Sequence, residues 1–327
     1  MQIMSCYTVC LNKNVKSAGS DKQLPRTFRY IRKPRPYIRQ NNSPFLVFIL
    51  ALLLVLLNTP HISYAFRFSG IASIDAPEIQ ELLKKVDKDT LVLININDTI
   101  ITPKSKMFRY NNNFYRTFIE DLYAISSYHS AAETAIANIW TQRQMMLVEP
   151  NWPAFITQLK ATGAMVFGFV KIPPACKLVK DFEEWQHNQI QQFKINFTSK
   201  INGKEIIKFD PTDFKSPSFY KGIIFTNAPT KAYILREFIE ITRIEPLKII
   251  IFENTKQELK EIDKFLTTVN VDYFAIEYTA AAQILGSPKA EVGKFQIKTV
   301  TNSGKWLEDE VAEAIVFPNV DTIHNKN

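Results

Sequence analysis

The chain has 327 residues, 46% of them hydrophobic, so it is long enough to bury the core of one large domain or two smaller ones. Its net charge of +8 comes from residues 1–43, which hold nine Lys or Arg and one Asp, and the remainder is balanced between acids and bases. We therefore expect no basic nucleic-acid-binding face on the folded body.

The basic arm precedes an unbroken apolar run, residues 45–57. The arm alone could bind nucleic acid or anionic lipid, but basic residues before an apolar run are typical of a secretory signal. The run is shorter than the ~20 residues of a spanning helix, and Ser63 and Ala65 place small residues where a signal peptidase reads. We predict a basic arm and signal over residues 1–65, cleaved after Ala65, and an exported body, 66–327, that is periplasmic or secreted. The alternative is an inner-membrane anchor through residues 45–57.

The cysteines and histidines indicate no disulfide, nucleophile or metal site. Cys6 and Cys10 lie in the arm, which leaves Cys176 alone in the exported body. We interpret Cys176 as a packed or surface thiol. His129 has no metal-ligand spacing and is interpreted as structural or solvated.

A helix and a buried strand open the body. Asp75 is the expected N-cap of a helix, with Pro77 in its first turn and an apolar face over residues 79–86. The apolar run from Leu91 is typical of a strand buried on both faces of a parallel sheet. It ends in the polar sequence Asn95-Ile96-Asn97-Asp98-Thr99-Ile100.

Two inserted segments are expected between further strand and helix pairs. Residues 104–150 are rich in aromatic residues and then in helix formers. A helix over residues 152–163 and a strand ending at Val170 follow, and residues 176–220 form the second insert, with a helix over residues 178–193 and a turn at residues 210–213.

The last third of the chain alternates strands and helices. Strands are predicted over residues 222–226, 248–253 and 272–278, helices over 232–241 and 257–266, a strand-like piece over 294–300 and a helix from Trp306. Alternation of this kind predicts an α/β fold: a Rossmann-like three-layer sandwich with a mostly parallel sheet and a helical insertion.

The polar sequence after the first strand resembles the first motif of the haloacid dehalogenase (HAD) superfamily of phosphohydrolases, a buried strand followed by Asp-x-Asp-x-Thr. Here Asn95 and Asn97 stand at the two carboxylate positions, followed by Asp98 and Thr99. Over roughly residues 70–315 the order of elements is similar to that of the uncharacterised bacterial DUF2608 family of HAD-like proteins. The resemblance implies that residues 104–150 form a cap over the site.

The resemblance assigns the remaining motif positions. Val170, or Thr226 in another register, stands where a Thr or Ser binds phosphate; Lys231 matches the motif lysine; and Glu253 and Asn254 stand where acids bind Mg²⁺. An amide is a poor nucleophile and no general acid. With Glu253 and Asp98 the only acids in this set, the resemblance leaves few ligands for Mg²⁺.

Three hypotheses remain open. The first is a catalytically inactive pseudo-phosphatase, a binding or interaction module that takes an unknown polar or anionic small molecule, or a protein, without a cofactor. The second is an active phosphohydrolase on a small phosphate ester, with Mg²⁺ and a non-standard site that uses Asp98, Glu253 or Asp210. The third is an α/β domain unrelated to HAD, in which Asn95, Lys231 and Glu253 would not converge. By strand alternation, Asp98 should point away from Asn97.

Overall fold

The computed structural model describes residues 65–110, 112–126, 129–172, 178–210, 216–226, 229–269 and 271–318. The basic arm, the apolar run over residues 45–57, Cys176 and most of the expected turn at residues 210–213 lie outside these ranges. The predicted cleavage point adjoins the first described residue, Ala65. No helix within the described ranges is long and apolar enough to cross a bilayer.

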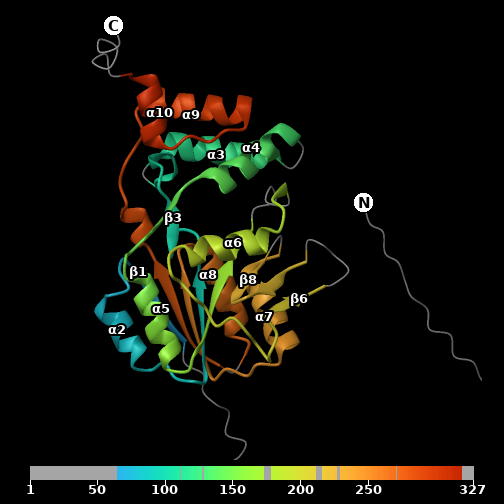
Figure 1. Cartoon of the computed structure of the whole chain (residues 1–327). Coiled ribbons are helices and arrows are strands. Elements are labelled where there is room, and N and C mark those ends of the chain that lie inside the picture. Colours follow the sequence, from blue (N-terminus) through green and yellow to red (C-terminus); the bar gives the residue numbers. More distant parts are fainter. Residues whose placement is uncertain are drawn as a thin grey trace, which may run out of the picture. The chain divides into compact units, whose positions relative to one another are not determined.

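In the described part of the chain, eight strands form one sheet in the order β1-β10-β9-β2-β5-β8-β7-β6. Figure 1 shows β1 at one side of this sheet and β8 and β6 at the other. The first six strands in this order run parallel, and β7 and β6 complete one edge as antiparallel strands. In sheet order the strands are β1 (Ala65–Ile71), β10 (Asp272–Tyr278), β9 (Lys248–Glu253), β2 (Thr90–Asn95), β5 (Met165–Val170), β8 (Ile223–Phe225), β7 (Ser218–Tyr220) and β6 (Ile206–Lys208).

Strand β2 lies inside the sheet between β9 and β5, and all six of its residues are buried. Its side chains alternate between two hydrophobic clusters, with Val92 and Ile94 in one and Leu91 and Leu93 in the other. The first cluster includes residues of α2 (Pro77–Leu83), α5 (Trp152–Ala161) and α6 (Phe182–Gln191), and the second includes residues of α7 (Lys231–Thr242) and α8 (Lys256–Leu266). The predicted three-layer α/β class is confirmed.

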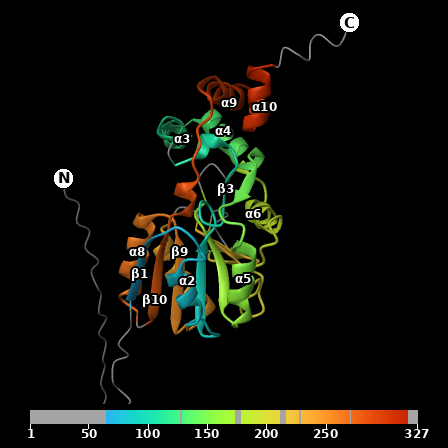
Figure 2. The same ribbon diagram turned by 90° about the vertical axis from the view of Figure 1, so that its left-hand side faces the viewer.

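A second group of elements lies beyond the carboxyl ends of the parallel strands, and we call it the cap (Figure 2). Strand β3 (Ile101–Pro103) pairs antiparallel with β4 (Met145–Leu147), and between them come η1 (Lys106–Phe108), α3 (Asn113–Ser126) and α4 (Ser130–Gln142). After β10 and the short η3 (Ala280–Gln283), the chain returns to the cap as α9 (Ala290–Ser303) and α10 (Asp309–Val316). The cap is therefore built from two separate segments of the sequence.

Hydrogen bonds hold the C-terminal segment to the inserted one. The Gln142 amide donates to the Gly304 carbonyl at 2.9 Å and accepts from the Trp306 backbone N–H at 2.9 Å. The Ser105 hydroxyl donates to the Asp309 carboxylate at 2.5 Å. The cap expected from the sequence comprised residues 104–150 alone, and the C-terminal segment had no predicted role there.

The predicted strand-like piece over residues 294–300 is wrong, because these residues belong to helix α9. Phe295 and Ile297 alternate with polar residues, a pattern that strands also show. The side chains that α9 buries are instead Val292, Gln296 and Val300, four residues apart on one helical face.

Three further differences concern short elements. Strand β1 was not predicted from the sequence, and neither were β6 and β7 within residues 176–220. Asp75 is not the N-cap of α2, because Ala76 holds that position. The Asp75 carboxylate instead accepts a hydrogen bond from Asn151 at 2.7 Å.

Candidate functional site

The candidate site lies at the carboxyl edge of the sheet, where the ends of four neighbouring parallel strands meet. Asn95 ends β2, Val170 ends β5, Glu253 ends β9 and Thr226 directly follows β8. Lys231 is the first residue of α7, the helix after β8. In parallel sheets this edge is where ligands bind.

Asn95 is 6% exposed, and its side-chain amide is hydrogen-bonded at both ends. Its Oδ1 accepts from the Lys231 ammonium at 2.9 Å. Its Nδ2 has three acceptors within reach: the Asn97 carbonyl at 2.7 Å, the Asn254 Oδ1 at 2.8 Å and the Thr99 hydroxyl at 3.0 Å. Both hydrogens of the amide therefore have acceptors within the protein, and its oxygen already accepts a hydrogen bond from a charged donor.

Lys231 and Glu253 form a buried ion pair beside Asn95. Their side chains are 3% and 2% exposed, and the ammonium donates to Glu253 Oε2 as well as to Asn95. The second carboxylate oxygen accepts from the backbone N–H groups of Asn254 at 3.1 Å and Thr255 at 3.3 Å. The pair is electrically neutral as a unit, so the buried ammonium adds little attraction for an anion.

Asn254 connects this network to the cap. Its Nδ2 donates to the Tyr110 hydroxyl at 2.7 Å, while its Oδ1 accepts from Asn95. Tyr110 lies between η1 and α3. One chain of hydrogen bonds thus runs from the sheet through Asn95 and Asn254 to the cap.

Val170 and Thr226, the two candidates for the phosphate-binding position, differ in surroundings. Val170 is 1% exposed and packs in the hydrophobic cluster beneath the edge. The Thr226 backbone N–H donates to the Val170 carbonyl at 3.0 Å, and the buried Thr226 hydroxyl has no hydrogen-bond partner among the described residues. Of the two, only Thr226 has a side chain that can hydrogen-bond a ligand.

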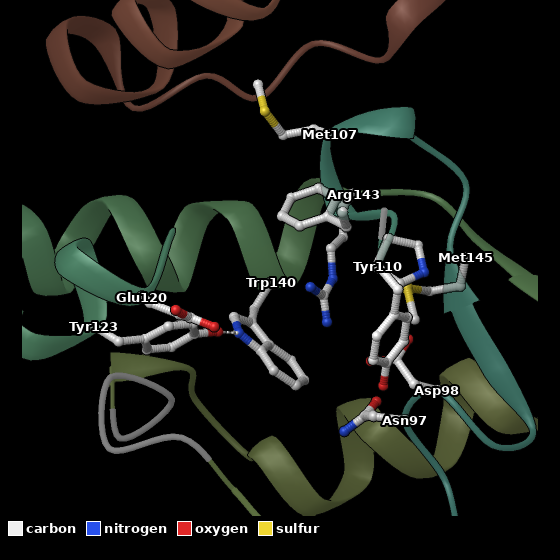
Figure 3. A pocket seen from close by; sticks show the side chains of 11 residues that line it. Asn97, Asp98, Met107, Tyr110, Glu120, Tyr123, Trp140, Arg143 and Met145 are labelled. Atoms are coloured by element: carbon white, nitrogen blue, oxygen red, sulfur yellow. Dashed lines mark hydrogen bonds between the residues drawn. The ribbon is translucent and has the colours of Figure 1, made fainter. Parts of the chain in front are cut away.

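The segment after β2 turns sharply. Asp98 has a positive φ of 55°, its N–H donates to the Ile101 carbonyl at 2.7 Å, and its carboxylate accepts from the Thr102 hydroxyl at 2.7 Å. The prediction that Asp98 points away from Asn97 is wrong, because β2 ends at Asn95 and strand alternation does not continue. Both side chains line the same cavity (Figure 3).

This cavity lies between the turn and the cap and has a volume of about 240 Å³. Four aromatic residues of the cap line it: Phe108, Tyr110, Tyr123 and Trp140. The Trp140 indole N–H donates to the Tyr123 hydroxyl, which joins α4 to α3. The sequence shows that this insert is rich in aromatic residues, but no pattern in it singles out Trp140 or Arg143.

Charged groups also line the cavity. Asp98 and Glu120 contribute carboxylates and Arg143 contributes a guanidinium, which stacks on Trp140 at 4.1 Å from the ring centroid. Behind the wall, Arg109 donates to the carbonyls of Pro103 and Lys104 at 2.8 Å each. Burial lowers the pKa of the Arg109 guanidinium, against the opposing influence of Asp309 and Asp98.

The residues of the edge do not fit the Mg²⁺ that the HAD resemblance implies. Both Glu253 oxygens are bonded to protein groups, and the Asn95 oxygen already accepts from Lys231. Asp98 is the remaining acid, and Mg²⁺ sites favour one or two carboxylates among oxygen ligands in octahedral geometry. Within the described ranges, no three His, Cys, Asp or Glu side chains gather in an arrangement that could hold a metal ion.

Fold and site together define a capped α/β protein with a closed polar network at the carboxyl edge of its sheet. The chain belongs to a family of proteins of unknown function, DUF2608, whose model matches residues 74–313. The resemblance to this family is confirmed. The uncharacterized protein RP296 of Rickettsia prowazekii (strain Madrid E) is 44% identical over 240 residues, which cover 73% of this chain and 88% of that protein. No solved structure matches the chain.

Proposed function

We propose that the protein is an exported HAD-like pseudo-phosphatase that binds a small ligand beneath its cap and does not transfer phosphate. The observation that carries this proposal is the state of Asn95. At the position of the HAD nucleophile stands an amide that is hydrogen-bonded at both ends and 6% exposed.

The convergence of three sequence-distant residues supports the HAD relationship. Asn95, Lys231 and Glu253 come from β2, α7 and β9, and the ammonium of Lys231 bonds to both of the others. Any parallel sheet brings its strand ends to one edge. What the HAD resemblance adds is a motif lysine at the start of the following helix, and Lys231 occupies that place.

The bonding of the network supports the loss of chemistry. Nucleophilic catalysis needs a group that can share an electron pair with phosphorus, and a carboxamide does this poorly. General acid–base catalysis, typically worth ~10²–10⁴-fold, needs a proton that Asn97 cannot exchange. The Lys231 charge is neutralised by Glu253 and does not remain to offset phosphate charge.

The cavity beneath the cap supports a binding role. It is hollow, mostly apolar and lined by a few polar groups, the features that mark small-molecule sites. Because Lys231 is buried and paired, the ligand contacts cavity groups and not the ammonium. A ligand without net charge suits this arrangement better than a phosphate ester.

Hydrolysis of phenyl phosphate with and without Mg²⁺ tests the loss of catalysis. We expect no turnover by the native chain and a gain on the double replacement Asn95→Asp, Asn97→Asp, which restores both carboxylates of the resembled motif. Asp98→Asn is the matched control for the hydrolase alternative. Native turnover that Asp98→Asn abolishes would overturn the proposal and identify Asp98 as the reacting group.

Export is tested separately. We expect the protein recovered from fractionated cells to begin at Phe66, as determined by N-terminal sequencing of the periplasmic or secreted fraction. An intact N-terminus in the membrane fraction would instead support an anchor through residues 45–57.

A further inference from the structure

We infer that the cavity beneath the cap binds a zwitterion, specifically a free α-amino acid with an apolar side chain. The inference deepens the proposed function, because it names the ligand class of the same cavity and rests on its role in binding. Three features of the cavity carry it: an apolar wall, an acceptor end and a guanidinium.

The wall suits an apolar side chain of limited size. Phe108, Tyr110 and Trp140 contribute aromatic rings, and Met145 adds a flexible thioether that adapts to the shape of a ligand. The volume of about 240 Å³ lies below the usual range for drug-sized ligands and suits a single amino acid.

The floor of the cavity offers hydrogen-bond acceptors. Asn97 and Asp98 both line it, and the buried Asn97 Oδ1 has no hydrogen-bond partner among the described residues. A buried acceptor without a donor costs free energy unless a ligand supplies one. An ammonium brings three N–H donors and a positive charge that complements the Asp98 carboxylate.

The opposite charge comes from Arg143, whose guanidinium is held in place by aromatic rings. It stacks on Trp140 at 4.1 Å and lies 5.4 Å from the Phe108 ring centroid. In Figure 3 the guanidinium lies between Trp140 and Tyr110, above Asn97. A guanidinium has five N–H donors in a planar fork, so it can bind a ligand carboxylate alongside its existing contacts.

The charge balance argues against a phosphate dianion. Arg143 is accompanied by the carboxylates of Asp98 and Glu120, so the lining brings one positive and two negative side chains. A dianion would gain one charge-assisted contact and face two like charges. A zwitterion places each of its charges near a group of opposite sign.

Isothermal titration of the full chain with four related probes tests the inference: L-phenylalanine, phenethylamine, 3-phenylpropionate and phenyl phosphate. The second lacks the carboxylate, the third lacks the ammonium, and the fourth carries the dianion. We expect phenylalanine to bind with a Kd of about 10 µM to 1 mM, and each single-charge probe to bind about tenfold more weakly or worse. Equal affinity for phenethylamine, tighter binding of phenyl phosphate or no binding of phenylalanine would each overturn the inference.

Variants locate the binding. We expect Arg143→Gln to weaken the binding of phenylalanine about tenfold and to leave the binding of phenethylamine unchanged. Arg143→Lys should have an intermediate affinity for phenylalanine, because it keeps the charge and loses the planar fork. Asn97→Ala should weaken the binding of both phenylalanine and phenethylamine. Arg236→Gln, on an exposed face of α7, is the matched control and should change neither. Equal loss for phenylalanine and phenethylamine in Arg143→Gln would contradict the assignment of the carboxylate.

The two proposals fail in different ways. Turnover of phenyl phosphate by the native chain would contradict the pseudo-phosphatase proposal, whether or not phenylalanine binds. Absence of phenylalanine binding in a chain that also lacks turnover would end only the ligand assignment.

Discussion

The ammonium of Lys231 is enclosed between the Glu253 carboxylate and the Asn95 amide, with the Lys231 and Glu253 side chains 3% and 2% exposed. Both charged groups are desolvated, and each is stabilised by the opposite charge of the other. A buried pair of this kind stabilises little by its presence, but it makes the loss of one partner costly.

Replacing Lys231 alone should therefore destabilise the fold strongly. We expect Lys231→Met to reduce the free energy of unfolding by about 3–5 kcal/mol, because it leaves the buried Glu253 carboxylate without its opposite charge. Lys231→Met with Glu253→Gln should recover most of this loss, since the glutamine oxygen still accepts from the Asn254 and Thr255 backbones. Urea denaturation measures both, with Lys84→Met, in an exposed pair with Glu81, as a control expected to change stability by less than about 1 kcal/mol. A double replacement as unstable as the single one would contradict the pairing.

The hydrogen bond from Asn254 to Tyr110 should couple the cap to the sheet. Tyr110→Phe removes the acceptor oxygen and should cost about 1 kcal/mol. Amide hydrogen exchange in α3 should rise more than exchange in β2 if the contact fastens the cap. Tyr233→Phe, on the exposed face of α7, is the matched control. Uniformly increased exchange across both regions would show that the contact stabilises the whole fold and does not act on the cap specifically.

Asn95→Asp should be tolerated poorly, although the two residues have nearly the same shape. The replacement puts a carboxylate oxygen where Nδ2 donates to the Asn97 carbonyl and to the acceptors of Asn254 and Thr99. We expect a loss of about 1–3 kcal/mol at neutral pH, because buried acceptors lose their donor. Thermal or urea unfolding measures it, with Asn188→Asp on the exposed side of α6 as control. Unchanged stability would mean that the network reorganises around a carboxylate.

Glu308 should make the stability of the cap depend on pH. It accepts from the Gln144 backbone N–H at 2.7 Å and from the Trp306 indole at 3.0 Å, yet burial raises the pKa of its carboxyl, against the effect of those two hydrogen bonds. Because the pKa of Glu308 is raised in the folded state, the folded protein keeps this proton at pH values where the unfolded chain has lost it. The contribution of Glu308 to stability is therefore complete below the unfolded-state pKa and is lost as pH rises through the folded-state pKa.

The variant Glu308→Gln isolates this effect, because it keeps the accepting oxygen and removes the charge. Free energies of unfolding measured between about pH 4 and pH 8 should fall less steeply with rising pH in the variant than in the native chain. Parallel curves would contradict the assignment to Glu308.

The central strands could be predicted well from the sequence, because a strand that is buried on both faces needs a continuous run of apolar residues. Strand β2 has four consecutive apolar residues between Thr90 and Asn95 and is buried throughout, and Asn95 and Glu253 stand at the carboxyl ends of such strands. Parallel strands bring their carboxyl ends to one edge, so the meeting of these residues could be anticipated without coordinates.

The periphery was harder to predict because its patterns are short or ambiguous. Strands β6 and β7 have three residues each, too few for alternation to be recognised. Helix α9 places a polar Gln296 at the centre of its buried face, where the Gln296 amide donates to the Leu307 carbonyl at 3.0 Å. Arg143 carries no pattern at all, since its place in the cavity depends on how α4 packs.

The two-segment cap has a consequence for kinetics. The chain passes between sheet and cap three times: after β2, before α5 and after β10. A lid on one hinge can swing open, whereas a lid tethered at three points resists rotation about any single axis. We therefore expect a ligand to enter or leave the cavity only when α3 or α4 loosens locally. Association should then be slower than the diffusional rate, and a ligand of given affinity should have a correspondingly long residence time.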